Sequence, residues 1–208
     1  MNRLDNFINE CDIALKTLSF KKSGTGRSYP ANETSSSLSK EEKSLSAQLM
    51  RVNLAGEVAA QALYRGQAMV CKDAEIKNHL VQAGEEETDH LIWCKKRLEE
   101  LNGKPSILNP VWYAGSFAIG AIFGSFGEKT SLGFVEETEK QVVKHLEKHL
   151  DKVSKNDAET IEILKTMRAD EDEHAQEAID NGSESLSEPT KKVMSFTAKV
   201  MTSSSAYI

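Results

Sequence analysis

Cysteine is scarce in this sequence. Its three cysteines, Cys11, Cys71 and Cys94, are an odd number, lie far apart and form no CxxC pair. This pattern excludes a disulfide framework and a cysteine zinc site, and it is typical of a reducing compartment. The N-terminal stretch also lacks the uninterrupted apolar run of a signal peptide and the acid-poor character of a transit peptide. We therefore expect neither export nor organelle import.

Basic clusters are missing as well. The chain has 26 basic and 32 acidic residues, a formal net charge of -6, and no run in which Lys and Arg alternate with aromatic residues. A nucleic-acid-binding surface needs a concentrated positive patch. We expect no nucleic acid among the partners of this protein.

Sustained alternation of apolar and polar residues, the pattern of a strand, is also absent. Apolar residues instead recur at helical spacing over four long stretches without internal proline, and a short helix is expected at residues 191–201. The pairs Asn102-Gly103 and Asn181-Gly182 are typical helix ends. The sequence therefore predicts an all-α fold, whose long helices cover roughly residues 39–71, 74–102, 130–150 and 157–180.

The chain before the first long helix divides into two parts. Residues 1–20 carry an apolar stripe and predict an amphipathic N-terminal helix. Residues 21–38 are rich in Ser, Gly and charge and have almost no apolar residue, which predicts a flexible polar linker. Residues 39–208 are then expected to form one domain.

Two Glu-x-x-His motifs lie on apolar helix faces. Glu87 and His90 share one face of their predicted helix, and Glu171 and His174 repeat the arrangement 84 residues later. A single such pair is usually a solvated surface pair. Both pairs, however, fall in line with the apolar residues of their helices, and a buried carboxylate and imidazole need a partner. A metal ion is the simplest one.

Each of the other two long helices supplies a further glutamate. Glu57 lies 30 residues before Glu87, and Glu139 lies 32 residues before Glu171, so the chain forms an internal pseudo-repeat. Glu136 and Glu137 are nearby alternatives to Glu139, but Glu139 lies on the apolar stripe at seven-residue steps from Leu132 and Leu146, whereas the other two lie off it. We take Glu139 as the ligand and keep Glu136 as the alternative.

These six side chains match one known type of metal site. Four carboxylates balance the charge of two divalent cations, and two neutral imidazoles add nitrogen donors, which favours a pair of transition-metal ions. One Glu from each of two helices with Glu-x-x-His from each of the other two is the di-iron pattern of ferritin-like four-helix bundles. The predicted ligands are Glu57, Glu87, His90, Glu139, Glu171 and His174.

Four more residues near the motifs have weaker assignments. Tyr64 lies two turns after Glu57 and is placed to hydrogen-bond a ligand carboxylate or simply to fill the core. His145 is either a supporting residue or proton relay of the site or a partly exposed helix histidine. His79 and His149 are expected at the surface.

Several stretches are distinctive beyond the ligands themselves. They are GEVAAQALYRGQA, EEETDHLIWC, LNPVWYAGSFAIGA, GFVEETEKQVVKHL and DEDEHAQEA, with KVM near the C-terminus. They resemble the demethoxyubiquinone hydroxylase family of di-iron enzymes, in its bacterial form, over essentially the whole chain. All six predicted ligands match those of that family.

The resemblance implies an O₂-dependent monooxygenase of ubiquinone biosynthesis with two iron ions per subunit. Its substrate would be the benzoquinol ring of a 2-polyprenyl-3-methyl-6-methoxy intermediate. Such a reaction needs an external electron donor, for which reduced nicotinamide is expected, although the chain has no GxGxxG motif. Electrons would then arrive by another route.

The segment between the second and third long helices, residues 105–127, contains no charged residue. Residues 107–126 are nominally long enough to span a bilayer, but Pro110 and three glycines weaken such a helix, and crossing would separate the two halves of the metal site. We interpret it as an apolar crossover helix that lies on the membrane surface, where a polyprenyl substrate dissolves. Burial under the N-terminal helix or in a subunit contact is the alternative.

The expected location is therefore the cytoplasmic side of a bacterial cell membrane, as a peripheral protein. Homo-oligomers and contacts with other ubiquinone-biosynthesis proteins are left open. The chief alternative function is a ferritin-like ferroxidase or iron-storage protein, which the apolar crossover disfavours. A manganese or iron protein that disproportionates peroxide and a metal-free membrane-binding bundle are the remaining alternatives.

Overall fold

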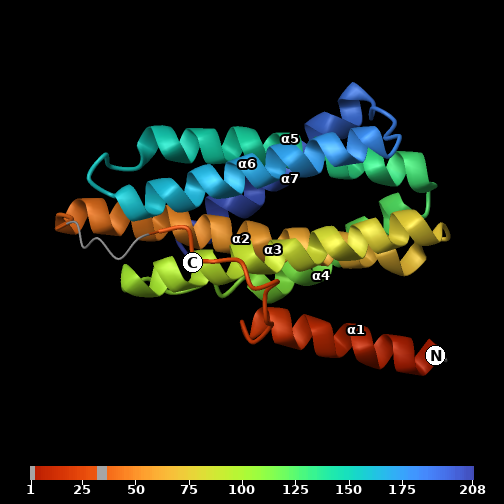
Figure 1. The fold of residues 1–208 in the computed structure, drawn as a ribbon, viewed down its shortest axis with the longest axis horizontal. Coiled ribbons are helices and arrows are strands. Elements are labelled where there is room, and N and C mark those ends of the chain that lie inside the picture. The colour runs from red at the N-terminus through yellow and green to blue at the C-terminus, as the bar shows by residue number, and fades with distance from the viewer. Residues whose placement is uncertain (1–2, 32–36) are drawn as a thin grey trace.

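The computed structural model describes residues 3–31 and 37–208. Those residues form helices and no strand, so the predicted all-α class is confirmed (Figure 1). The four predicted long helices are present, and the last helix is longer than expected. The helices are α1 (Arg3–Leu18), α2 (Lys40–Val70), α3 (Ala74–Glu100), α4 (Asn109–Gly124), α5 (Glu128–Lys152), α6 (Ala158–Asp180) and α7 (Glu188–Ser205).

Three of the four long helices, α2, α3 and α6, begin at residues whose side chains cap them. The Ser39 hydroxyl accepts the backbone N–H of Glu42, and the Glu42 carboxylate accepts the backbone N–H of Ser39, which is a complete capping box. Asp73 caps α3 and Asp157 caps α6 in the same way, each accepting backbone N–H groups of the first turn. These caps explain why α2, α3 and α6 start within about one residue of their predicted positions.

The bundle consists of two helical hairpins. α2 and α3 are joined by a short connection and pack along each other, and so do α5 and α6; the long crossover that contains α4 links the two pairs (Figure 1). Short connections produce antiparallel neighbours, and one long crossover is typical of ferritin-like bundles. α4 packs along α2, while α7 contacts α2 and α5.

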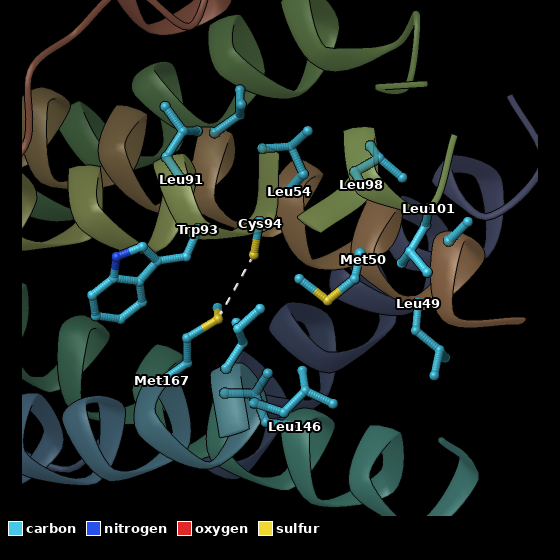
Figure 2. Close-up of a cluster of buried hydrophobic side chains, with 14 of the residues drawn as sticks. Leu49, Met50, Leu54, Leu91, Trp93, Cys94, Leu98, Leu101, Leu146 and Met167 are labelled. Atoms are coloured by element: carbon cyan, nitrogen blue, oxygen red, sulfur yellow. Dashed lines mark hydrogen bonds between the residues drawn. The ribbon is translucent and has the colours of Figure 1, made fainter. Parts of the chain in front are cut away.

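The core lies between the hairpins. Leu54, Leu91, Leu98 and Met167 belong to one buried cluster, and Figure 2 shows the Cys94 thiol of α3 pointing at Met167 Sδ of α6, to which it donates at 3.7 Å. All five side chains are at most 1% exposed. Closely packed sulfur and branched side chains therefore join α3 to α6 at one end of the bundle.

α4 approaches α2 closely because glycines line the contact. A Cβ on Gly120 would overlap the backbone oxygen of Leu63, and a Cβ on Gly66 would overlap that of Phe117. The opposite face of α4 carries exposed Val111 and Ile122, and Ile107 and Phe126 flank the helix at its two ends; each of the four is more than half exposed. Within the described residues, no helix combines the length and apolar character needed to cross a membrane.

The predicted linker at residues 21–38 has no helix or strand in its described parts, 21–31 and 37–38. Residues 32–36 lie outside the described residues, as do residues 1–2 of the predicted N-terminal helix. The described part contacts the bundle: Ala31 is buried, and the Tyr29 hydroxyl donates to Glu100 at 3.1 Å. The flexibility of the linker and the division into residues 1–20, 21–38 and 39–208 stay predictions.

Candidate metal centre

Four of the six predicted ligands meet inside the bundle. Glu57 of α2, Glu87 and His90 of α3, and Glu171 of α6 each offer a ligand atom within 4.8 Å of the others. All four side chains are at most 5% exposed. The helical spacing of Glu87 and His90 brings both onto the face of α3 that contacts α6, as the stripe predicts.

The other two predicted ligands border this group. His174 Nδ1 of α6 lies 3.2 Å from Glu87 Oε1 and 3.4 Å from Glu171 Oε2. Glu139 of α5 is 2% exposed and accepts a 2.7 Å hydrogen bond from the Tyr64 hydroxyl of α2. The predicted hydrogen bond between Tyr64 and a ligand carboxylate is therefore confirmed as a contact with Glu139.

The structure also separates Glu139 from its neighbours in sequence. Glu136 pairs with Lys140 and accepts a hydrogen bond from Ser183, and Glu137 pairs with Lys191. Both point away from the buried group into partly exposed ion pairs. Geometry thus favours Glu139 over the alternative Glu136.

The buried carboxylates make the site strongly negative. Burial, reinforced by the charges of Glu87 and Glu171, raises the pKa of Glu57 well above its ordinary value. Burial and the same two carboxylates raise the pKa of Glu139. These carboxylates stay charged at neutral pH only if positive charge is placed among them.

The two histidines of the site also have raised pKa values, which in their case favours the charged form. Burial by itself would lower the pKa of His174, but hydrogen bonds and charges from Glu171 and Glu87 raise it to about 12. Burial also opposes a charge on His90, yet Glu87 and Glu171 raise the pKa of that imidazole well above its ordinary value. Both shifts have the same cause, which is that the buried carboxylates favour positive charge placed among them.

Unpaired atoms show that the residues fit a metal better than they fit one another. Glu87 Oε1 and Glu171 Oε2 lie 3.2 and 3.4 Å from His174 Nδ1, yet within the described residues none of these three buried atoms makes a hydrogen bond of good geometry. Buried polar atoms are normally paired, so three orphans in one group indicate a missing partner that accepts both carboxylate and imidazole lone pairs. Oxygen and nitrogen donors of this kind suit a transition-metal ion.

Each histidine points one nitrogen into the group and the other nitrogen at a carboxylate of the opposite helix. His90 Nε2 lies 2.8 Å from Asp170 of α6, and His174 Nε2 lies 3.1 Å from Glu86 of α3. Such outer partners fix the ring orientation of metal-binding histidines. The sequence reasoning missed both, although the signal was present: an acidic residue directly precedes each Glu-x-x-His motif.

His145 does not join this group. Its ring contacts that of His149, with 4.0 Å between centroids and a tilt of 57°, and burial together with Lys148 and Lys152 lowers its pKa to about 4. A role of His145 in the site stays a prediction that these contacts do not support. The expectation that His149 is a surface residue is wrong, because His149 is 5% exposed. It lies three residues after the buried Leu146, on the same inward face of α5. His79 is partly exposed near Glu177.

Fold and site together define a class: a helical-bundle metalloprotein whose buried carboxylates and histidines come from both hairpins. Residues 44–205 match the family described as "Ubiquinone biosynthesis protein COQ7", so the chain belongs to that family. The matched range contains all six predicted ligands. The family resemblance found in the sequence is therefore confirmed.

Curated relatives agree along nearly the whole chain. A protein of Legionella pneumophila (strain Lens) named 3-demethoxyubiquinol 3-hydroxylase is 49% identical over 207 residues, covering 99% of this chain and 97% of its own. A protein of the same name from Francisella philomiragia is 49% identical, over 96% of this chain and 94% of its own. Another from Nitrosococcus oceani is 46% identical, over 100% and 98%.

Proposed function

We propose that this chain is a 3-demethoxyubiquinol 3-hydroxylase that uses O₂ at a di-iron centre. The observation that carries the proposal is the buried group of Glu57, Glu87, His90 and Glu171 in a chain that aligns end to end with proteins of that name. Glu139 and His174 complete a set of six ligands for two iron ions per subunit. Asp170 and Glu86 orient the two imidazoles.

The reaction replaces a ring hydrogen of the quinol with a hydroxyl group. One atom of O₂ enters the ring and the other leaves as water, which consumes two electrons and two protons besides the substrate. Iron held by these six residues would supply the redox chemistry toward O₂, and we propose reduced nicotinamide as the external source of electrons. The protein contributes ligand geometry and a buried site that excludes water.

We further propose that the outward face of α4 binds the cytoplasmic surface of the bacterial cell membrane. This face carries exposed Val111 and Ile122, exposed Ile107 and Phe126 flank the helix, and no charged residue lies between them. A polyprenyl quinol dissolves in the bilayer, so an enzyme that rests on the surface reaches its substrate without crossing. Self-association and contacts with other ubiquinone-biosynthesis proteins stay predictions.

Single-turnover hydroxylation tests the activity. The protein is loaded anaerobically with Fe²⁺, supplied with a short-chain demethoxyquinol and ¹⁸O₂, and the product is analysed by mass spectrometry. We expect one ¹⁸O atom in the hydroxylated ring. Iron oxidation without hydroxylated product, in a sample shown to bind the quinol, would replace the proposal with the ferroxidase alternative.

Glu171→Ala tests the ligand assignment separately. Because Glu171 contacts both His90 and His174, its loss is expected to reduce iron binding below two ions per chain while the helix content stays unchanged. Iron is measured by elemental analysis and helix content by circular dichroism. Glu173→Ala, an exposed glutamate of the same helix, is the control and should retain both ions. Two ions in Glu171→Ala would refute the assignment.

A further inference from the structure

Residues 22–31, called here the N-terminal loop, lie across α3 beside the candidate metal centre. The backbone N–H of Thr25 donates to Asp89 Oδ1 at 3.0 Å, and its hydroxyl donates to Asp89 Oδ2. Lys96 Nζ lies 3.8 Å from the centroid of the Tyr29 ring. The loop precedes the range that matches the family, 44–205, yet it makes specific contacts with the helix that carries two predicted ligands.

The start of this loop is fixed through α1. Thr17, the penultimate residue of α1, is fully buried and its hydroxyl donates to Gln61 Oε1 at 3.0 Å. The Gln61 amide in turn donates to the backbone oxygen of Glu87 at 3.4 Å. The end of α1, from which the loop starts, is therefore connected by hydrogen bonds through Gln61 to the turn of α3 that carries Glu87.

Arg27 of the N-terminal loop makes the contact closest to the site. Its Nη1 lies 2.7 Å from Asp170 Oδ2 and its Nη2 donates to Asp170 Oδ1 at 3.1 Å, so the guanidinium holds both carboxylate oxygens. Asp170 Oδ2 also lies 2.8 Å from His90 Nε2. A two-point contact of this kind fixes the plane of the carboxylate as well as its position.

A second path leads from Arg27 to the same histidine. The guanidinium carbon lies 4.9 Å from the centroid of the Trp93 ring, and the Trp93 ring lies 5.3 Å from the His90 ring. Asp170 therefore contacts the outer nitrogen of His90, and Trp93 contacts the His90 ring. Arg27 contacts both Asp170 and Trp93. The His90 side chain is fully buried beneath them.

The His174 half of the centre is built differently. Its outer carboxylate, Glu86, accepts a hydrogen bond from the neutral amide of Gln82 at 3.0 Å. The Glu86 side chain is 32% exposed, against 17% for Asp170. Two motifs that are alike in sequence are therefore supported unequally in the fold.

We infer that Arg27 is a positioning residue for the His90 half of the metal centre, acting through Asp170 and Trp93. This inference rests on the proposed di-iron function and adds a residue outside the ligand set. Loss of the guanidinium leaves Asp170 free to rotate, so His90 presents its inner nitrogen less accurately. Loss of an outer partner typically weakens metal binding by about 10-fold to 100-fold.

Stepwise Co²⁺ binding tests the inference without relying on activity. Calorimetry and the visible absorption of bound Co²⁺ are followed for the wild type and for Arg27→Gln, Arg27→Lys and Arg168→Gln. Arg168 is the matched control, because its Nε and Nη2 both donate to Glu147 Oε1. The Arg168 side chain is 40% exposed, against 39% for Arg27. Unfolding by urea with a chelator present shows whether each metal-free variant is folded.

The wild type is expected to bind two Co²⁺ in two steps. Arg27→Gln should weaken one step by about tenfold and leave the other within about twofold. Arg27→Lys, which keeps the charge but loses the two-point contact, should fall between them. Arg168→Gln should match the wild type in both steps.

The inference is overturned if Arg27→Gln binds both ions as the wild type does, weakens both steps equally, or is matched by Arg168→Gln. If Arg27→Gln does not fold, Arg27→Lys decides by the same criteria. A wild type that binds fewer than two Co²⁺ would refute the proposed centre together with the inference, and this result is distinct because it appears without any substitution.

Discussion

Two buried tyrosines of the bundle differ in the state of their hydroxyl groups. Tyr64 donates to Glu139 at 2.7 Å, whereas the Tyr113 hydroxyl has no hydrogen-bond partner among the described residues. The two rings are 2% and 6% exposed. The pair therefore separates the effect of a hydrogen bond from that of a buried ring.

Tyr64→Phe is expected to lower the free energy of unfolding by about 1 kcal/mol or more, because it leaves Glu139 Oε1 buried without its partner. Tyr113→Phe should be neutral or slightly stabilising, since it removes a hydroxyl that is buried and unpaired. Urea unfolding of the metal-free proteins measures both. Equal losses in the two variants would show that the contact with Glu139 contributes nothing.

At this scale the sequence predicted most of the site. The apolar stripe selected Glu139 over Glu136, and the structure confirms that Glu139 is buried; the spacing from Glu57 placed Tyr64 near a predicted ligand, and the structure confirms its hydrogen bond to Glu139. The sequence did not predict that Asp170 of α6 contacts His90 of α3 across the interface between the two helices. Such a pair depends on the axial register of α3 against α6, which hydrophobic periodicity in one helix does not contain.

At the scale of one element, α4 uses its glycines in two different ways. Gly120 faces the backbone of Leu63, where an added Cβ would overlap, while an added Cβ on Gly115 would meet open space. Sequence reasoning treated both alike, as residues that weaken a membrane span. The structure shows that only the first is needed for packing against α2.

Gly120→Ala is expected to destabilise the protein by about 2 kcal/mol or more, because α4 must move away from a rigid backbone. Gly115→Ala should instead stabilise it by about 0.5 to 1 kcal/mol, the usual gain of alanine over glycine inside a helix. Thermal and urea unfolding compare the two variants. A destabilised Gly115→Ala would show that this exposed face is packed against something in solution.

The helix α5 carries a histidine pair, a buried His149 and a partly buried His145, that makes stability depend on pH. Burial, then the neighbouring His145 and Lys152, lowers the pKa of His149 to about 3 from an ordinary 6.5. The pKa of His145 is lowered to about 4 by burial, Lys148 and Lys152. Below pH 6.5 the unfolded chain therefore binds more protons than the folded one, so stability falls as the pH falls.

His149→Phe is expected to remove part of this dependence. The variant fills the same space and removes an Nδ1 atom that is buried without a partner, so the stability near pH 7 should change by less than about 1.5 kcal/mol. The free energy of unfolding of the variant, relative to that of the wild type, should increase by about 2 kcal/mol as the pH falls from 6.5 toward 4. Urea unfolding at several pH values measures the difference, which would be independent of pH if the pair titrates normally.

For the whole molecule, the order of helices and their division into two ligand-bearing halves could be predicted from the sequence. The N-terminal loop could not. Its polar composition predicts a chain without regular structure, but Arg27 reaches Asp170, 143 residues away, and Thr25 reaches Asp89. Polar contacts between distant residues leave no periodic trace, whereas the buried stripes of α2, α3, α5 and α6 repeat at every turn.

The layered arrangement also decides which surface can meet a membrane. α4 lies on the α2 and α3 side of the bundle, while α6 belongs to the other hairpin (Figure 1). Val111 and Ile122 of α4 are 59% and 53% exposed, and Ile179 near the end of α6 is 39% exposed. Substitutions of these exposed apolar residues can therefore compare membrane binding by α4 with membrane binding by α6.

The double variant Val111→Asp and Ile122→Asp is expected to reduce co-sedimentation with anionic liposomes by about tenfold or more, because two apolar side chains lose their burial in the interface. Iron content should stay at the wild-type value, since neither residue is among the proposed ligands. Ile179→Asp is the control and should bind liposomes as the wild type does. Unchanged binding of the double variant, or an equal loss in the control, would contradict the assignment of α4 as the membrane face and leave its apolar stripe to be explained by a contact between protein chains.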